Sequence, residues 1–534
     1  MLRLGVWVEG LVQGVGFRPF VYTLAHEHDL CGFVRNTPEG VYMEIEGSQK
    51  AVNAFIEDFH AKLPPLARVD TFKTLTLNPK DDENFVIEQS EYSGSKHSAI
   101  LPDMAVCEDC LREMKDPKNR RYKYPFTNCT NCGPRYSIIH TVPYDRPNTS
   151  MNVFKMCPDC QGEYDNPLDR RYHAQPISCP NCGPRLELKS IKDGVIIAKD
   201  EEAIIYLAKE IKNGSIVAMK GLGGFHLICD ALNQKAIQTL RMRKNRPTKP
   251  FAILCKDLPM ANEYAKMSEA EVKMLSSIIK PIVLLTKKPN TKMPKDIAPN
   301  TDRLGIFLPY TPLHVSLFEH LDGPIVATSA NRSGEPIIHK GEIVGEKLGH
   351  VVDFVLDFNR EIINASDDSV VQMIGEKSLY LRLSRGLAPL TFPVNLKSHE
   401  TILAVGAQQK NALALLHEGK IIQSPYIGDM HTLEGFEFFN RTLKSLKSFY
   451  NIEPSLILCD MHPQYSTTQW AKNQNLPIQF VQHHHAHICA TMLEHGLSGP
   501  VLGVAWDGTG YGADGTIWGG EFLYCDRGEF ERVG

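Results

Sequence analysis

Four Cys-x-x-Cys pairs between residues 107 and 182 constrain this chain more than any other feature of its sequence. Each half of the segment has 18 residues between its two pairs, and DPKNRRY and CTNCGPR in the first half match NPLDRRY and CPNCGPR in the second. The segment is therefore an internal duplication. Four thiolates form a closed tetrahedral zinc site, so the repeat predicts two structural zinc ions, with the ligands Cys107, Cys110, Cys129, Cys132, Cys157, Cys160, Cys179 and Cys182.

The spacing favours zinc sites that each lie within one half, and it leaves a site shared between the halves open.

The chain has 534 residues, which predicts about three to five domains. Its first residues do not form a signal peptide and no apolar run has the length of a membrane span, so we expect a cytoplasmic protein with reduced cysteines. A net charge of -4 argues against a general nucleic-acid or membrane-surface binder.

The first ninety residues have the pattern of a split βαβ domain. LRLGVWVEG alternates as a strand, PFVYTLAHEHDL has helical spacing, and CGFVRNTPEGVYMEIEG reads as two strands. AVNAFIEDFHAKL is a second helix and DENFVIEQ a last strand. The glycine-rich turn VQGVGFR precedes the first helix, where backbone N-H groups and the Arg18 fork suit a phosphate. A tight turn with a surface arginine is the alternative.

VQGVGFRPF and GFVRNTPEGVYMEIEG together resemble the two signature segments of acylphosphatases. The resemblance implies a ferredoxin-like domain that hydrolyses a carboxyl phosphate anhydride, such as carbamoyl phosphate. It implies that Arg18 binds the phosphate and that Asn36 positions the attacking water. The phosphate loop would consist of Gln13, Gly14, Val15, Gly16 and Phe17.

From about residue 195 the chain alternates between helices and strands, which is typical of an α/β domain. KGLGGFHL and TSANRSG follow apolar strands, where ligand crevices form. The basic run RMRKNRPTKP is a polyphosphate site or, alternatively, a solvated face. KNRP and TSANRSG resemble the KxR and SxN signature of the YrdC family, which implies ATP with Mg²⁺ and adenylation of a carbamate-like acid. The implied nucleotide and carbamate residues are Lys220, His226, Lys244, Arg246, Ser329, Asn331, Asp368, Ser369, Arg382 and Arg385.

The last segment combines ILAVGAQQKNALALL with a histidine-rich helix, HHHAH. His483 and His487 are four residues apart and share one helix face, which suits a metal site or ordinary packing. The segment resembles the TsaD family, a branch of the actin and sugar-kinase ATPase fold. That resemblance implies a divalent metal, with iron as one candidate, held by His483, His487 and Asp507. Lys410 and Asn411 would lie in a nucleotide-facing turn, and His485 stands where the family has glutamate.

The order of these segments resembles the HypF family of hydrogenase maturation factors. We expect an acylphosphatase-like domain over 1–91, two zinc fingers over 100–190, a YrdC-like domain over 195–390 and the first part of a TsaD-like domain over 394–534. About 140 residues remain after Pro393, so we expect a C-terminally truncated chain. The family implies a carbamoyltransferase that modifies the C-terminal cysteine of HypE, for the cyanide ligands of [NiFe]-hydrogenase. It implies no nucleic-acid or membrane partner.

Two other functions use part of the same motifs. A threonylcarbamoyl-type tRNA modification enzyme would use the YrdC-like and TsaD-like segments, and it leaves the acylphosphatase segment unexplained. A nonenzymatic zinc-repeat scaffold leaves the phosphate loop, the SxN loop and the histidine pair without a role.

Overall fold

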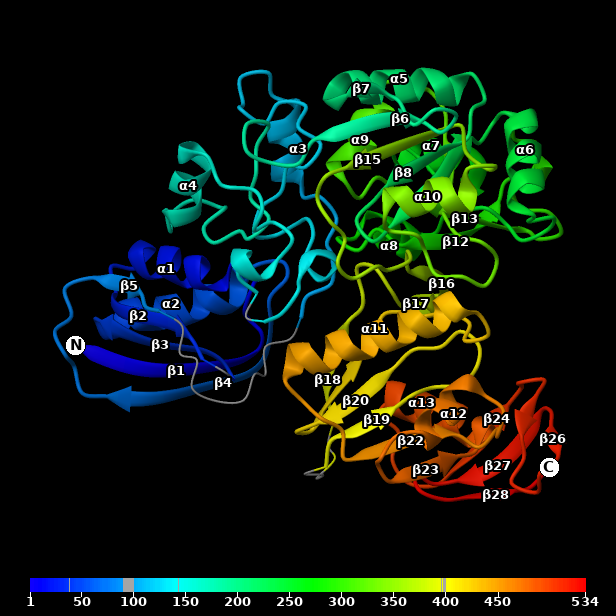
Figure 1. The fold of residues 1–534 in the computed structure, drawn as a ribbon. Coiled ribbons are helices and arrows are strands. Elements are labelled where there is room, and N and C mark those ends of the chain that lie inside the picture. Colours follow the sequence, from blue (N-terminus) through cyan, green and yellow to red (C-terminus); the bar gives the residue numbers. More distant parts are fainter. Residues whose placement is uncertain (38, 90–99, 143, 395, 397–399) are drawn as a thin grey trace. The chain divides into compact units, whose positions relative to one another are not determined.

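The structure is a computed structural model, and it describes residues 1–37, 39–89, 100–142, 144–394, 396 and 400–534. The chain divides into two compact units (Figure 1). One consists of Met1–Ser333, Ile337–Pro389 and Ser448–Asn451, and the other of Gly334–Pro336, Leu390–Lys447 and Ile452–Gly534. Among the described residues, none of the helices combines the length and the apolar character that a membrane crossing needs.

The N-terminal domain is a mostly antiparallel sheet covered by two helices. Its elements are β1 (Leu2–Leu11), α1 (Phe17–Glu27), β2 (Cys31–Asn36), β3 (Gly40–Gly47), α2 (Gln49–Ala61), β4 (Arg68–Leu77) and β5 (Phe85–Ile87). The strand order is β4-β1-β3-β2-β5. Val21 of α1 and Phe55 of α2 are fully buried in the core beneath the sheet, as the apolar spacing of both helices requires.

The sequence reading missed one strand in this domain. The strand predicted in DENFVIEQ is present as the short β5, which is parallel to β2. The strand that was not predicted is β4, which pairs with β1 from Arg3 to Leu11. The alternation in β4 is weak because most of its residues are exposed or only half-buried. An edge strand with little burial lacks the apolar period that reveals other strands.

The two fingers contain little regular structure. Their elements are α3 (Glu108–Lys115), η1 (Tyr136–Ile138), η2 (Arg146–Asn148) and α4 (Pro158–Asp165). Cys107 is the N-cap residue of α3, and Cys157 is the N-cap residue of α4. Each Cys-x-x-Cys pair at a helix start therefore presents one sulfur before the helix and one from its first turn.

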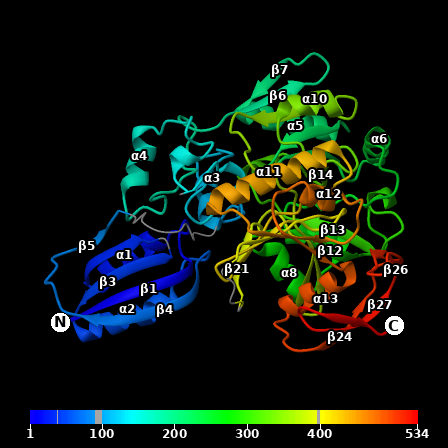
Figure 2. The ribbon, with the colours of Figure 1, turned by 60° about the horizontal axis from the view of Figure 1, so that its bottom comes forward.

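A large mixed sheet organises the next domain (Figure 2, green). Its strand order is β17-β16-β12-β13-β10-β14-β9-β8-β15-β6-β7, and β11 pairs with β12. The strands are β6 (Leu186–Ser190), β7 (Ile196–Lys199), β8 (Val217–Lys220), β9 (Phe225–Asp230), β10 (Ile253–Leu254), β11 (Ala265–Lys266), β12 (Ile282–Lys287), β13 (Arg303–Phe307), β14 (Ile325–Ser329), β15 (Phe354–Phe358), β16 (Val370–Ile374) and β17 (Lys377–Arg382).

Helices and a short turn accompany this sheet. They are α5 (Asp200–Lys212), α6 (Gln234–Lys244), α7 (Leu258–Tyr264), α8 (Glu269–Ser276), η3 (Lys295–Ile297), α9 (Pro312–Phe318) and α10 (Gly341–Leu348). Two buried apolar clusters use alternate residues of β8 and β9, since Ala218 and Leu227 belong to one cluster and Met219 and Ile228 to the other. The sheet is therefore buried on both faces, as expected of a sheet in an α/β domain.

The second unit is built around a six-stranded sheet with the order β18-β21-β20-β19-β22-β23. Its strands and helices are β18 (Leu390–Pro393), β19 (Ile402–Ala404), β20 (Ala414–His417), β21 (Lys420–Gln423), α11 (Leu433–Tyr450), β22 (Leu456–Asp460), α12 (Ser466–Lys472), β23 (Ile478–Val481) and α13 (His483–Glu494). Smaller sheets follow, formed by β24 (Val501–Ala505), β25 (Gly510–Tyr511), β26 (Ile517–Trp518), β27 (Glu521–Cys525) and β28 (Phe530–Arg532).

Candidate functional site

The predicted phosphate loop is an open backbone turn at the start of α1. Gly14 and Gly16 have φ of 71° and 74°, a left-handed conformation that favours glycine. Val15 and Phe17 are buried, so their side chains anchor the loop in the core. Gly16 is the N-cap residue and has no side chain to occupy the first N-H groups of the helix. Those N-H groups and the positive end of the helix dipole suit an anion.

The loop is tied to the hairpin that carries Asn36. The Gln13 side-chain amide donates to the carbonyl oxygens of Thr37 and Gly40, at 2.7 and 2.6 Å. Asn36 is the last residue of β2, immediately before this contact. The structure thus brings together the two sequence segments on which the acylphosphatase resemblance rests.

Residues of the fingers lie beside Arg18, which the sequence reading did not anticipate. Burial, together with the charge of Arg18, lowers the pKa of His173 to about 4. Burial raises the pKa of Asp145, and Arg18 opposes that shift. A Cβ atom at Gly16 would lie 3.2 Å from the Thr130 hydroxyl oxygen. Residues of the finger segment therefore lie against the phosphate loop. His173 is in its neutral form beside Arg18.

The eight cysteines form two separate clusters, each within one repeat. In the first cluster, Cys107 and Cys129 sulfurs lie 3.6 Å apart and Cys110 and Cys132 sulfurs 3.5 Å apart. Corresponding distances in the second cluster are 3.7 Å for Cys157 and Cys179, and 3.5 Å for Cys160 and Cys182. A tetrahedral zinc with Zn–S of about 2.3 Å has sulfur–sulfur edges of about 3.8 Å. The donor sets fit zinc, and the shared-site alternative is wrong.

The Arg-Arg pair of each repeat contacts the cysteine cluster of the other repeat. Arg120 donates to Cys160 Sγ at 3.3 Å, and Arg170 donates to Cys110 Sγ at 3.4 Å. Arg121 donates to Glu163 at 2.5 and 3.0 Å, and Arg171 forms the matching ion pair with Glu113. A zinc with four thiolates carries a net negative charge, which these guanidinium groups offset. The RRY repeats in the sequence thus reflect a reciprocal contact between the two halves.

We expect Glu163→Gln to weaken the zinc site of its own repeat and the contact between repeats. Arg120 and Arg121 would lose the carboxylate that orients them, in a partly buried position where such pairs contribute about 1–3 kcal/mol. Zinc transfer to a chromogenic chelator should be severalfold faster than in the unaltered chain. Glu202→Gln, which removes an exposed carboxylate from α5, is the control and should leave the release rate unchanged. Equal rates for both variants would contradict the reciprocal contact.

The KxR and SxN motifs meet at the end of β14. Lys244 Nζ donates to the Ser329 carbonyl at 2.7 Å, and to the Asn331 carbonyl and side-chain oxygens at 2.8 and 2.9 Å. The Ser329 hydroxyl donates to the Asn331 side chain at 3.0 Å. Burial, aided by Arg246, lowers the pKa of Lys244 to about 7. Arg246 donates to Thr328 at 3.3 Å. Lys244 and Arg246 thus lie around one loop, which is an arrangement suited to phosphates.

A buried charged network lies next to this loop. His226 is the cross-strand partner of Ser329, and its Nε2 lies 3.1 Å from Asp368. Arg385 donates to Asp368 at 2.5 Å and stacks on the ring of Tyr310 at 3.5 Å. Arg385 and His226 stabilise the ionised carboxylate and hold the pKa of Asp368 below its usual range despite complete burial. The network fixes the His226 ring beside the SxN loop.

The remaining predicted residues of this domain have local contacts. The Ser369 hydroxyl donates to the Arg385 carbonyl and accepts from the Ser384 N-H, both at 2.9 Å, so it joins two loops. Arg382 donates to the Asp368 carbonyl at 2.7 Å. Lys220 forms an ion pair with Asp357 at 2.9 Å and donates to the Phe358 carbonyl.

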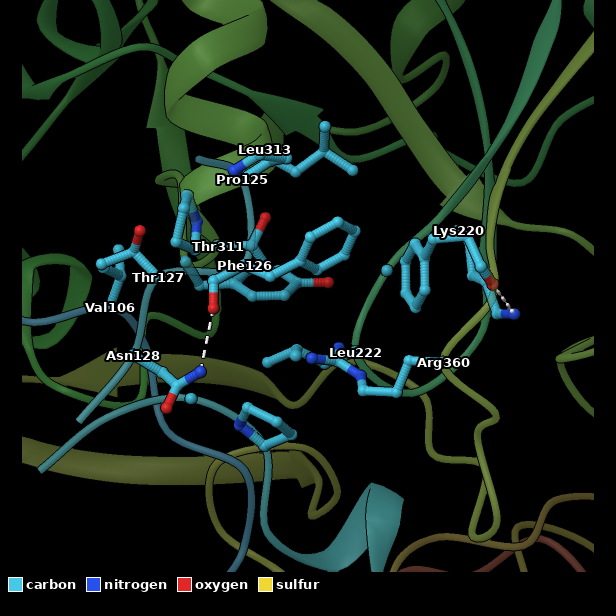
Figure 3. Close-up of a pocket in the computed structure, with 16 residues that line it drawn as sticks. Val106, Pro125, Phe126, Thr127, Asn128, Lys220, Leu222, Thr311, Leu313 and Arg360 are labelled. Atoms are coloured by element: carbon cyan, nitrogen blue, oxygen red, sulfur yellow. Dashed lines mark hydrogen bonds between the residues drawn. The ribbon is translucent and has the colours of Figure 1, made fainter. Parts of the chain in front are cut away.

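A small cavity, partly open to solvent, lies between the first finger and the large sheet (Figure 3). Phe126 and Asn128 line it from the finger, and Lys220, Tyr310 and Arg360 from the domain that follows. Tyr310 also belongs to the buried network of Arg385. The cavity therefore adjoins the residues around the SxN loop. Arg360 was not predicted as a site residue from the sequence, because its segment FNREI has no ligand-binding pattern that we recognised.

In the second unit, α13 brings its first and fifth residues to one carboxylate. Asp507 Oδ2 lies 2.8 Å from His483 Nε2 and 3.3 Å from His487 Nε2. The three potential ligand atoms lie within 4.8 Å of one another. Two imidazoles and a carboxylate fit a divalent metal such as iron or zinc. The side chains predicted to form a metal site are therefore adjacent.

Asp460 orients this cluster and was not predicted from the sequence. It ends β22, and its carboxylate accepts from His483 Nδ1 at 2.6 Å. The contact directs Nε2 toward Asp507 and raises the pKa of His483. The sequence signal that could have identified Asp460 is its position as a carboxylate at the end of the strand LILCD. Such a partner sets the tautomer and orientation of a histidine ligand.

We expect Asp460→Asn to weaken divalent metal binding at His483 and His487 by about 10- to 100-fold, the usual effect of losing such a partner. Equilibrium dialysis of the zinc-loaded chain against Mn²⁺ measures this, because thiolate sites bind Mn²⁺ poorly. Glu494→Gln, at the exposed end of the same helix, is the control. An unchanged Mn²⁺ affinity in Asp460→Asn would show that Asp460 does not act on the cluster.

The other residues predicted for this unit have structural contacts. His485, two residues after His483, contacts the Asp526 carbonyl and Cys489, so it points away from Asp507. Asn411 is buried, and its amide donates to the carbonyls of Val405 and Ala407, which closes the turn between β19 and β20. Lys410 is exposed in that turn.

Family models match the chain in the order of its domains. They are an acylphosphatase model over residues 4–87, a HypF finger model over 106–139 and 156–189, a telomere recombination model (Sua5, YciO and YrdC) over 209–384, a HypF Kae1-like domain model over 397–494, and a second-subdomain model of the carbamoyltransferase Kae1-like domain over 503–534.

Relatives match over nearly the whole chain. The carbamoyltransferase HypF of Synechocystis is 46% identical over 99% of this chain and 69% of its own length. The corresponding protein of Rhizobium leguminosarum is 43% identical, over 100% of this chain and 68% of its own length. A crystal structure of full-length HypF in the phosphate- and nucleotide-bound form superposes with a TM-score of 0.94 at 44% identity, covering 100% of this chain and 70% of that one.

Proposed function

The chain belongs to the HypF family of ATP-dependent carbamoyltransferases, and we propose that it couples hydrolysis of carbamoyl phosphate to synthesis of carbamoyl adenylate. The carbamoyl group then passes to the C-terminal cysteine of HypE, where it becomes the cyanide ligand of a [NiFe]-hydrogenase iron. The observation that carries the proposal is the presence, in one chain, of the phosphate loop, the KxR and SxN contact, and the histidine and aspartate cluster.

The first step uses the loop before α1. Backbone N-H groups of the loop and the Arg18 guanidinium hold the phosphate, and Asn36 orients the attacking water. The water oxygen attacks phosphorus and the bond to the carbamoyl oxygen breaks. Inorganic phosphate and carbamate are the products. Arg18 lowers the barrier by offsetting the negative charge on the phosphoryl oxygens in the transition state.

The second step uses the loop after β14. Lys244 and Arg246 contact the phosphates, while Ser329 and Asn331 hold the nucleotide. A carbamate oxygen attacks the α-phosphorus of ATP, carbamoyl adenylate forms and pyrophosphate leaves. Mg²⁺ bound with ATP supplies further neutralisation of the phosphates. His226, oriented by Asp368, contacts the acid.

The third step uses the second unit. His483, His487 and Asp507 would hold a divalent metal, which would supply neutralisation of phosphate charge. Asp460 keeps His483 in the required orientation. The HypE thiolate attacks the carbamoyl carbon, the bond to the adenylate oxygen breaks, and AMP leaves. The eight zinc-ligating thiolates favour a reducing compartment, so we place this chemistry in the cytoplasm.

Pyrophosphate release tests the proposal. The purified chain is incubated with ATP and Mg²⁺, and with carbamoyl phosphate, with threonine plus bicarbonate, or without either. We expect pyrophosphate and AMP only with carbamoyl phosphate. Pyrophosphate formed with threonine and bicarbonate would instead indicate threonylcarbamoyl chemistry, and no pyrophosphate under any condition would contradict the adenylation step.

A further inference from the structure

Arg360 is a buried arginine that lines the cavity between the first finger and the large sheet. Only 4% of its surface is exposed. Figure 3 shows its side chain reaching toward the middle of the lining residues, whereas Lys220 points aside to its own hydrogen bond. Within the described parts of the chain, no hydrogen bond or ion pair joins the Arg360 guanidinium to another residue, and its Nε is buried without an acceptor.

The guanidinium remains charged in this position. Burial lowers the pKa of Arg360 to about 10, which still leaves the group protonated at neutral pH. The ring centroids of Phe126 and Phe358 lie 5.6 and 5.1 Å from its central carbon. Aromatic faces stabilise the cation in part, but they satisfy none of its five N-H donors. A buried charge without an acceptor is costly, and such groups usually have a partner.

The neighbouring cation does not share this property. Lys220 is paired with Asp357 and with a backbone carbonyl. Arg360, in contrast, is hydrogen-bonded to none of the described residues, and the buried Asp103 carboxylate acts on it through charge alone. Leu222, Leu313 and Phe126 provide apolar walls. A low local dielectric strengthens the attraction between Arg360 and an anion that enters.

We propose that Arg360 binds a small planar oxyanion of the carbamate and bicarbonate class. A guanidinium presents two parallel N-H donors that match the two oxygens of a carboxylate. The hollow lined by these residues is partly open to solvent and is of a size for a small anion, not for a nucleotide. The choice of carbamate as the natural ligand rests on the proposed function, which generates carbamate in the first step and consumes it in the second.

The position of the cavity agrees with this ligand. Gly221 and Tyr310 line it. A Cβ atom at Gly221 would lie 3.4 Å from the Tyr310 hydroxyl and 3.8 Å from Cε1 of His226. Gly221 and Tyr310 therefore connect the cavity to the His226 and Asp368 pair. Arg360 would hold the acid in the same domain as the residues that adenylate it.

Direct binding is tested with ¹³C-labelled bicarbonate, a stable anion of this class. The ¹³C line width is measured with the unaltered chain, with Arg360→Met, with Arg360→Lys and with Arg112→Met, which removes an exposed arginine from the first finger. We expect Arg360→Met to weaken the affinity by about 10- to 100-fold, the effect of losing charge-assisted hydrogen bonds. Arg360→Lys keeps the charge, and its bicarbonate affinity should lie between those of Arg360→Met and the unaltered chain. Equal binding by Arg360→Met and the unaltered chain would overturn the proposal.

Turnover separates this proposal from the proposed function. In Arg360→Met we expect pyrophosphate formation from carbamoyl phosphate to fall at least tenfold, with phosphate release and zinc content unchanged. Pyrophosphate at the unaltered rate would refute a role for Arg360 in holding carbamate.

If the unaltered chain itself forms no pyrophosphate, the proposed function fails, while the bicarbonate measurement still decides the anion site. If Arg360→Met does not fold, Arg360→Lys gives the same comparison, with a smaller expected loss. Pyrophosphate formed from bicarbonate alone would identify bicarbonate as the ligand.

Discussion

Arg18→Ala should lower carbamoyl phosphate hydrolysis by about 100- to 1000-fold, the usual cost of losing a group that stabilises charge in a transition state. Arg18 is in the first turn of α1, directly after a loop whose glycines leave backbone N-H groups open toward an anion. Alanine is compatible with the helix and removes the guanidinium that follows that loop. Inorganic phosphate release measures the effect.

The zinc content and the melting temperature of Arg18→Ala should match those of the unaltered chain. Arg112→Ala, which removes an exposed arginine from α3, is the matched control and should hydrolyse carbamoyl phosphate at the unaltered rate. If Arg18→Ala retains normal hydrolysis, Arg18 does not act on the phosphate and the first step occurs elsewhere.

Lys244→Met should abolish most pyrophosphate formation, by about 100-fold or more, because it removes a cation from the predicted polyphosphate site. Lys244 also joins Ser329 to Asn331 through three hydrogen bonds, so its loss loosens the loop that would hold the nucleotide. Phosphate release from carbamoyl phosphate should remain, because the phosphate loop lies in another domain. Pyrophosphate and phosphate are measured in the same reaction.

The control for this variant is Lys235→Met, on the same helix α6 and at its exposed N-terminal end. A structural role for Lys244 alone would lower the melting temperature and would leave the Michaelis constant for ATP unchanged in the folded fraction. We expect the Michaelis constant for ATP to rise in folded Lys244→Met, in addition to any loss of melting temperature. Unchanged pyrophosphate formation in folded Lys244→Met would remove Lys244 from the adenylation site.

The sequence predicted the elements whose patterns are strong. The duplicated Cys-x-x-Cys spacing indicated two four-sulfur clusters, and the structure places each in one repeat. The helices around Val21 and Phe55 have clear apolar spacing, and both are present. β4 was missed because an edge strand with mostly exposed residues has no such period.

The sequence did not predict contacts that depend on chain folding. Asp460 is 23 residues from His483, and only the adjacency of β22 and α13 brings them together. The exchange of Arg-Arg pairs between the fingers needs both repeats in place. Arg360 is distinguished by burial and a missing partner, and neither property can be seen in the letters FNREI. Long-range geometry, and not local propensity, determines these three features.

The central claim is that one chain converts carbamoyl phosphate into carbamoyl adenylate. The most direct measurement supplies [¹⁴C]carbamoyl phosphate and ATP with Mg²⁺ to the zinc-loaded chain, and then separates nucleotides by chromatography at low temperature. We predict that ¹⁴C migrates with an adenylate, and that it does so neither in Arg18→Ala nor in Lys244→Met. Label found only in free carbon dioxide, while phosphate is released at the normal rate, would contradict the account.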